Sequence, residues 1–194
     1  IGARAHEHGR SGGQKQLLSL ACAVIHGPEL LFLDEPTSAV DPESRRDFWA
    51  RLFELADAGT TLLVSTHLMD EAERCHRLAI LDHGALVADG TPAELTGRLA
   101  GRTFVVEADD PRRAQRALAD VPGVLGVAQV GNALRVLTGE AAAQDGSTAG
   151  VAQRLQDAIA KAGQPARVAA AAANLEDVFV AATRTGRART ERAA

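Results

Sequence analysis

Two acidic side chains follow directly after an apolar run in the first part of the sequence. The run is Leu30–Leu33, and Asp34 and Glu35 come immediately after it. A continuous apolar run of this length predicts a strand buried on both faces of a parallel sheet. Ligands of α/β proteins bind at the carboxyl edge of such a sheet. There, one carboxylate can hold Mg²⁺ through water and its neighbour can orient an attacking water. The alternative is a helix-capping Asp beside a solvated Glu.

A histidine follows a second apolar run in a similar place. Thr61–Ser65 predicts another buried strand, and His67 comes shortly after its end. Beside a polyphosphate, a histidine at this edge could position the terminal phosphate or the attacking water. The alternative is a hydrogen-bonded histidine with a purely structural role.

A glycine-rich segment precedes both strands. Ser11, Gly12, Gly13 and Gln14 stand where an apolar helical pattern begins. The free N–H groups at a helix N-terminus favour an anion, and glycine lets a phosphate approach the backbone closely. Because Ser-Gly-Gly is also common in loops, this segment alone gives only a weak indication of phosphate binding.

Taken in order, these segments resemble the second half of the nucleotide-binding domain of ABC transporters. The resemblance implies that Ser11–Gln14 is the signature motif, which contacts ATP held by a second such domain. It implies that Asp34 holds Mg²⁺ through water, that Glu35 polarises water, and that His67 is the switch histidine. The segment Ser38–Asp41 looks like the D-loop. The ligands implied are ATP and Mg²⁺.

One motif of that family is missing from the sequence. No G-x-x-x-x-G-K-[ST] segment, the phosphate-binding loop called Walker A, occurs in the 194 residues. The chain begins at Ile1, and its one methionine is Met69. We therefore expect an N-terminally truncated fragment that is inactive alone, with the phosphate-binding loop upstream of Ile1.

Turn and cap signals divide the first half of the chain into short elements. A helix is expected from Ser11 to about Gly27, and a second from Asp41-Pro42 to about Gly59. A short helix, a hairpin around His83-Gly84 and a capped helix that starts at Thr91 should follow. Their expected ranges are Leu68–Cys75, then Leu78–Leu81 paired with Leu86–Ala88, then Thr91 to Gly97.

The second half has a different order of elements, strand-helix-strand-strand-helix-strand plus a final helix, which is a ferredoxin-like pattern. The expected ranges are Thr103–Glu107, Asp110–Asp120, Gly123–Val130, Ala133–Leu137, Val151–Ala162, Arg167–Ala171 and Asn174–Thr183. The predicted fold is α/β. The resemblance implies the C-terminal half of a P-loop, RecA-like ABC ATPase domain for residues 1–97, and the order of elements predicts a small α+β ferredoxin-like regulatory domain for residues 98–183. Residues 184–194 form a basic tail that we expect to be disordered.

The last predicted helix points to one branch of the family. Asn174–Phe179 is similar to the closing motif of ATPase subunits that serve ABC-2 type exporters, a group that includes drug efflux systems, and Thr66–Glu73 fits the same branch. The alternative is that Leu175, Val178 and Phe179 form the apolar face of an ordinary amphipathic helix.

Composition and charge argue against several classes of protein, namely nucleic-acid-binding, secreted and membrane-spanning proteins. The net charge of −4 gives no electrostatic footprint for nucleic acid. The sequence contains neither a signal peptide nor an apolar run of membrane-spanning length. Cys22 and Cys75 lie in helical patterns, which favours packing in a reducing cytoplasm over a disulfide. His6 and His8 are interpreted as part of a solvated loop, and the basic tail gives only weak support for contact with anionic lipid.

The sequence as a whole predicts the ATP-binding subunit of an ABC exporter. The full protein should hydrolyse ATP as a dimer, most simply a homodimer, and drive a permease on a separate chain at the inner face of a bacterial plasma membrane. Two alternatives remain: a non-transport ABC ATPase acting on ribosomes or DNA, and a non-catalytic dimerisation or regulatory module.

Overall fold

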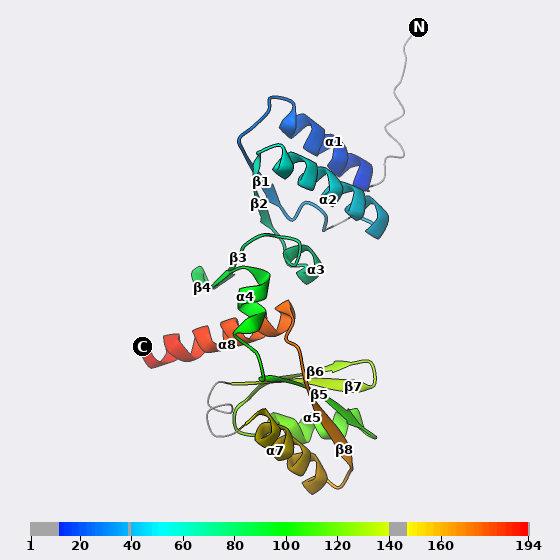
Figure 1. The fold of residues 1–194 in the computed structure, drawn as a ribbon, viewed down its shortest axis with the longest axis vertical. Coiled ribbons are helices and arrows are strands. Elements are labelled where there is room, and N and C mark those ends of the chain that lie inside the picture. Colours follow the sequence, from blue (N-terminus) through cyan, green and yellow to red (C-terminus); the bar gives the residue numbers. More distant parts are fainter. Residues whose placement is uncertain (1–11, 39, 140–146, 194) are drawn as a thin grey trace. The chain divides into compact units, whose positions relative to one another are not determined.

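The computed structural model describes residues 12–38, 40–139 and 147–193. The chain divides into two compact units, Ile1–Leu68 and Met69–Ala194, and each is described by itself (Figure 1). This division falls well before residue 97, where the change in sequence pattern places the domain boundary. Both units mix helices and strands, as expected for the α/β class.

The first unit is built around a strand-helix-strand crossover. Strand β1 (Leu30–Asp34) is followed by α2 (Pro42–Asp57) and then by β2 (Thr61–Ser65). The two strands pair in parallel, which requires a crossover such as α2. Helix α2 starts as predicted, because Asp41 caps it by accepting a hydrogen bond from the Ser44 N–H at 2.9 Å, with Pro42 in the first turn.

Helix α1 (Gly12–Val24) packs against α2 through a position that only glycine can occupy. Gly13 is buried, and a Cβ added there would lie 2.3 Å from Cβ of Ser44 and 3.3 Å from Val40. Such a contact is far inside van der Waals distance. The missing side chain therefore lets the start of α1 approach the start of α2.

The strands of this unit are covered on one face only. Leu31 is 8% exposed, whereas Phe32 is 67% exposed and Leu63 on β2 is 57% exposed. The prediction of strands buried on both faces is therefore wrong for the described residues. The reason is that these residues form a sheet of two strands, β1 and β2, so the second face meets no covering layer.

The second unit begins with short elements. Helix α3 spans Met69–Ala72, shorter than predicted, and β3 (Leu78–Asp82) and β4 (Ala85–Gly90) form the expected antiparallel hairpin. His83 and Gly84 both have positive φ, 49° and 78°, as a two-residue type I′ turn requires. Helix α4 (Pro92–Gly97) starts with the predicted capping box between Thr91 and Glu94.

A four-stranded antiparallel sheet forms the larger part of the second unit. Its strands run in the order β6-β7-β5-β8. In sequence, the elements are β5 (Thr103–Ala108), α5 (Pro111–Ala119), β6 (Val124–Val130), β7 (Ala133–Thr138), α7 (Thr148–Lys161) and β8 (Ala166–Ala171). Helices α5 and α7 cover the same face (Figure 1), because their buried residues share one cluster with Phe104, Val106, Leu134 and Val136.

Helix α8 closes a second core in this unit. It spans Leu175–Ala193, past Thr183, where the apolar pattern ends and a disordered tail was expected. Arg and Ala favour helix, and no proline interrupts these residues. Leu175, Val178 and Ala181 pack with Leu137 of the sheet and also with Leu95 and Leu99 at and beyond α4. Because residues before 98 share this core, the compact unit extends back to Met69.

Candidate functional site

Parallel pairing brings the predicted acidic residues and the histidine to one edge. In the β1–β2 register, Asp34 lies opposite Ser65, so both strands end at the same place. Glu35 follows Asp34 directly, and His67 lies two residues beyond Ser65. The side chains of Asp34, Glu35 and His67 are all exposed at this edge, which leaves them accessible to a ligand.

Glu35 and His67 contact each other directly. Nδ1 of His67 lies 2.9 Å from Oε1 of Glu35, and the two side chains are 62% and 46% exposed. The contact fixes one nitrogen of the imidazole on the carboxylate. It leaves Nε2 of His67 and Oε2 of Glu35 for other partners. A carboxylate and an imidazole in this arrangement can together hold and orient a water or a phosphate oxygen.

The backbone of Glu35 adopts an unusual conformation. Its φ is 42°, in the left-handed region that non-glycine residues rarely occupy. This conformation costs about 1–2 kcal/mol for a residue with a Cβ. The N–H of Glu35 donates to the Ser65 carbonyl at 3.0 Å, and the Glu35 carbonyl accepts from the Ser38 N–H at 3.3 Å. Strained residues held in this way cluster at functional sites.

Ser65 is a site residue that sequence reasoning missed. Its hydroxyl donates to Oδ1 of Asp34 and accepts from the Glu35 N–H at 3.1 Å. Aligning the ends of the two predicted parallel strands would have placed Ser65 beside Asp34. The next residue, Thr66, accepts from the Leu68 N–H at 3.0 Å, which shapes the turn that carries His67.

The two residues of the predicted D-loop have different surroundings. Ser38 is exposed, and its backbone N–H donates to the Glu35 carbonyl as given above. Asp41 caps α2, and hydrogen bonds from Ser44 hold the pKa of its carboxyl below the ordinary value of 3.8. The geometry gives Asp41 a clear structural role, and a contribution of this segment to nucleotide binding stays a prediction.

The signature-motif segment is described in part. Ser11 lies outside the described residues, as do His6 and His8. Gly12 and Gln14 are exposed in the first turn of α1, whereas Gly13 is buried against α2. The structure therefore separates the segment into one packing position and two accessible ones.

The oxygen atoms at this edge suit a hard cation. Carboxylate oxygens are ligands that Mg²⁺ accepts, and Asp34 and Glu35 supply them at this edge. Across the part of the chain that the structure describes, no cluster of three His, Cys, Asp or Glu side chains could hold a metal by itself.

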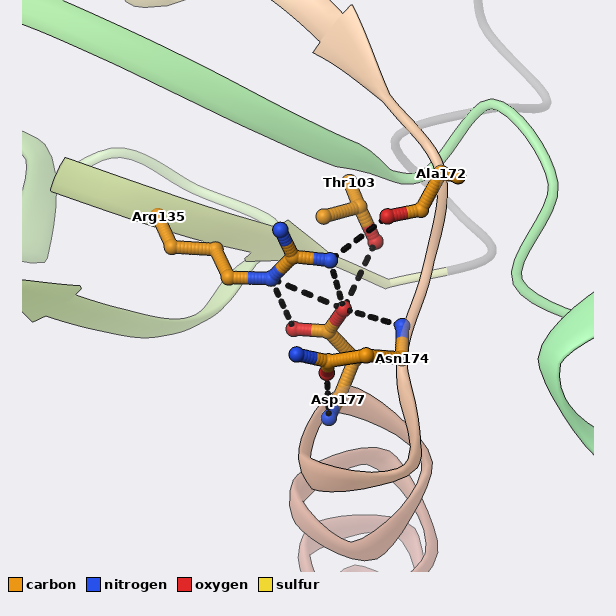
Figure 2. Close-up of polar contacts among 5 residues, drawn as sticks. All are labelled: Thr103, Arg135, Ala172, Asn174 and Asp177. Carbon is orange, nitrogen blue, oxygen red and sulfur yellow. Dashed lines mark hydrogen bonds and ion pairs between the residues drawn. The ribbon is translucent and has the colours of Figure 1, made fainter. Parts of the chain in front are cut away.

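A second polar cluster lies in the other unit, at the start of α8 (Figure 2). Nε of Arg135, on β7, lies 3.1 and 3.0 Å from the two carboxylate oxygens of Asp177. Nη2 of Arg135 donates to Oδ2 of Asp177 and to the Ala172 carbonyl, both at 2.6 Å. Asn174 and Asp177 exchange hydrogen bonds of 3.0 Å, so Asn174 caps α8 as predicted.

This cluster changes the interpretation of residues 174–179. Leu175 and Val178 are buried as the apolar-face alternative predicts, but Phe179 is 41% exposed. Asp177, only 6% exposed, is the buried anchor that sequence reasoning missed. The Asn-x-x-Asp spacing of a helix cap was the signal that could have found it.

Comparisons with known proteins bear on the first unit. The family model described as ABC transporter matches residues 2–38, which include the signature segment, Asp34 and Glu35. The chain is 50% identical over 88 residues to the probable multidrug ABC transporter ATP-binding protein YbhF of Escherichia coli, covering 45% of this chain and 15% of that protein. The N-terminal part of this chain is therefore similar to ABC transporter ATP-binding proteins.

Two further relatives support the same family. The daunorubicin/doxorubicin resistance ATP-binding protein DrrA of Streptomyces peucetius is 39% identical over 118 residues, covering 60% of this chain and 36% of that protein. The Nod factor export ATP-binding protein I of Neorhizobium galegae is 48% identical over 92 residues, 47% of this chain and 26% of that protein. The chain thus spans between 15% and 36% of the length of these relatives.

These matches confirm the predicted resemblance to ABC transporter ATP-binding subunits over part of the chain. They do not test the roles of single residues. The family-model match ends at residue 38, before β2 and His67. Within the described ranges, none of the helices has the length and apolarity of a membrane span.

Proposed function

We propose that this chain supplies part of the catalytic site of an ATP-binding subunit that powers an ABC exporter. The observation that carries the proposal is the contact between Glu35 and His67, next to Asp34, at the carboxyl edge of β1 and β2. Hydrolysis of ATP to ADP and phosphate needs a positioned water and compensation of phosphate charge. Glu35 and His67 can position the water at this accessible edge, and Asp34 can hold the cation that would compensate the phosphate charge.

Each of the three residues has a distinct role in this proposal. Glu35 accepts a hydrogen bond from the attacking water and polarises it, a contribution typically of about 10²–10⁴-fold in rate. His67 contacts Glu35 and directs its other nitrogen to the terminal phosphate. Asp34 would hold Mg²⁺ through water, and the chemistry that the cation would supply is positive charge beside the phosphates.

The remaining parts of the site come from outside these residues. The 194 residues contain no phosphate-binding loop, so we infer that the chain alone does not hydrolyse ATP. Ser11–Gln14 would contact ATP held by a second subunit, most simply an identical one. A permease on a separate chain would bring the dimer to the inner face of the membrane. Export as the direction is supported by the relative named for Nod factor export, and the relative named for daunorubicin/doxorubicin resistance is compatible with it.

The two parts of the chain have different roles in this proposal. We infer that the β1-α2-β2 crossover belongs to the C-terminal half of a P-loop ATPase domain. The sheet order β6-β7-β5-β8, with α5 and α7 on one face, supports a ferredoxin-like fold for that part, and we infer that its role is regulatory. The motif at 174–179 supports the ABC-2 branch.

The test of the catalytic role is Glu35→Gln in the complete protein that contains this chain. The amide keeps the shape of the side chain but cannot polarise water as a carboxylate does. We expect steady-state ATP hydrolysis to fall by about 10²-fold or more, while equilibrium binding of ATP is retained.

A matched control is Glu29→Gln, the same change at the opposite end of β1, where Glu29 is also exposed. It should hydrolyse ATP at the wild-type rate. Near-normal turnover by the Glu35→Gln protein would remove Glu35 from its role. Steady-state ATP hydrolysis by the purified 194-residue chain would contradict the proposal that an external phosphate-binding loop is needed.

A further inference from the structure

The side chain of Ser65 bonds to both acidic residues at the end of β1. Its hydroxyl donates to Oδ1 of Asp34 and accepts from the backbone N–H of Glu35 at 3.1 Å. The Glu35 N–H also reaches the Ser65 carbonyl at 3.0 Å. A single residue of β2 thus holds the side chain of one acid and the backbone of the next.

The bond to Asp34 orients its carboxylate. A carboxylate rotates about its Cβ–Cγ bond, and it presents whichever oxygen is not already engaged. Because Oδ1 of Asp34 accepts from Ser65, Oδ2 is the oxygen left for a water or a cation. Removing the Ser65 hydroxyl would let either oxygen face the ligand and would reduce the fraction in the productive orientation.

The bond to Glu35 acts on the backbone. Glu35 has a φ of 42°, which a residue with a Cβ adopts only when its surroundings hold it there. Ser65 supplies two acceptors for the one Glu35 N–H, its carbonyl and its hydroxyl. The left-handed backbone in turn sets the direction in which the Glu35 side chain leaves β1 and meets His67.

We propose that Ser65 is a positioning residue, which fixes the Asp34 carboxylate and the Glu35 backbone in the arrangement that ATP hydrolysis needs. The inference rests on the proposed ATPase function and goes beyond it, because Ser65 itself contacts neither water nor phosphate in the proposed role. Asp34, Glu35 and Ser65 are all exposed, so their mutual hydrogen bonds contribute little to folding. Their geometry matters much more for a reaction, where misplacement by about 1 Å can cost about 10²-fold.

The experiment uses the complete protein with a pair of variants of equal shape, Ser65→Thr and Ser65→Val. Threonine keeps the hydroxyl, valine replaces it by a methyl group, and both side chains suit a strand. We expect Ser65→Thr to retain kcat and Ser65→Val to lose about 10- to 100-fold, the range for a hydrogen bond to a charged group. The KM for ATP should stay within about twofold, since positioning acts on the transition state.

A second measurement needs no turnover. Binding of Mn²⁺ in the presence of a non-hydrolysable ATP analogue, followed by electron paramagnetic resonance, reports on Asp34 directly. We expect Ser65→Val to weaken Mn²⁺ binding several-fold and Ser65→Thr to leave it unchanged. Thr61→Ala, at the other end of β2, is the matched control and should alter neither kcat nor Mn²⁺ binding.

The outcomes separate the inference from the proposed function. Absence of ATP hydrolysis by the wild-type complete protein would overturn the proposed function itself. An active wild type with equal kcat and Mn²⁺ affinity in the Ser65→Thr and Ser65→Val proteins would overturn the role of Ser65 alone. So would an equal loss in Thr61→Ala, because the effect would then come from the strand and not from the hydroxyl.

Discussion

At the scale of single residues, the backbone of Glu35 opposes folding while its side chain serves the proposed reaction. The φ of 42° carries a penalty of about 1–2 kcal/mol for any residue with a Cβ. Glycine has no such penalty. We therefore expect the Glu35→Gly protein to be about 1 kcal/mol more stable than Glu35→Ala, although both lack the carboxylate. Urea denaturation of the full chain measures the difference, and a more stable Glu35→Ala protein would contradict the strain.

Gly13 is a second single residue whose type matters, because the close packing of α1 against α2 leaves no space for a side chain there. Gly13→Ala would place a methyl group 2.3 Å from Cβ of Ser44, so α1 and α2 would have to move apart. We expect a loss of about 1–3 kcal/mol in the free energy of unfolding. The control is Gly97→Ala in α4, where an added Cβ meets nothing within 4 Å. Adding Ser44→Gly to Gly13→Ala should restore part of the loss, and a fully additive double variant would argue against the contact.

At the scale of elements, one buried ion pair attaches α8 to the sheet. The side chains of Arg135 and Asp177 are 19% and 7% exposed. Removing one partner of such a pair leaves an uncompensated buried charge, which costs about 3–5 kcal/mol. We expect Asp177→Ala to lose about that much stability and to speed amide hydrogen exchange in α8. Arg51→Ala, which breaks the exposed Arg51–Glu54 pair, should change stability by less than about 1 kcal/mol.

The start of α2 should respond to pH. Hydrogen bonds from Ser44 lower the pKa of Asp41 below 3.8, so the folded state prefers the ionised carboxylate. The contribution of this cap is therefore present above the ordinary pKa and is lost as the pH falls through the lowered value. Asn also caps helices but does not titrate. The measurement is the free energy of unfolding of the wild-type and Asp41→Asn proteins from pH 6 to about pH 3, which should fall more steeply for the wild type. Parallel curves would show that ionisation of Asp41 does not contribute to the pH dependence of stability.

At the scale of the whole molecule, the sequence predicted features made by neighbouring residues better than contacts between residues far apart in the chain. The caps at Asp41, Thr91 and Asn174 were predictable because each depends on residues three or four positions apart. The contacts of Ser65 with Asp34 and of Asp177 with Arg135 were missed, because these partners lie 31 and 42 residues apart in the sequence. The open face of β1–β2 was also missed, since an apolar run shows that a strand could be buried but not what covers it.

The division at Leu68–Met69 leads to a prediction about folding units. Leu95 and Leu99 share a core with Leu137, Leu175 and Val178, so cutting at residue 97 would remove part of that core. We expect residues 69–194 expressed alone to unfold cooperatively, and residues 98–194 to be less stable by about 2 kcal/mol or more because they lose a buried leucine. Urea denaturation compares the two. Equal stability would favour the boundary suggested by the change in sequence pattern.

The open face of the first unit also affects how the purified chain behaves in solution. Phe32 and Leu63, with Leu30 at 48% exposed, present apolar side chains on a sheet of two strands. Surfaces of this kind adhere to one another as protein concentration rises. Light scattering by the 194-residue chain should therefore increase with concentration and fall when Phe32 and Leu63 are changed to serine. Solubility, more than folding, then limits the concentration at which this chain can be studied.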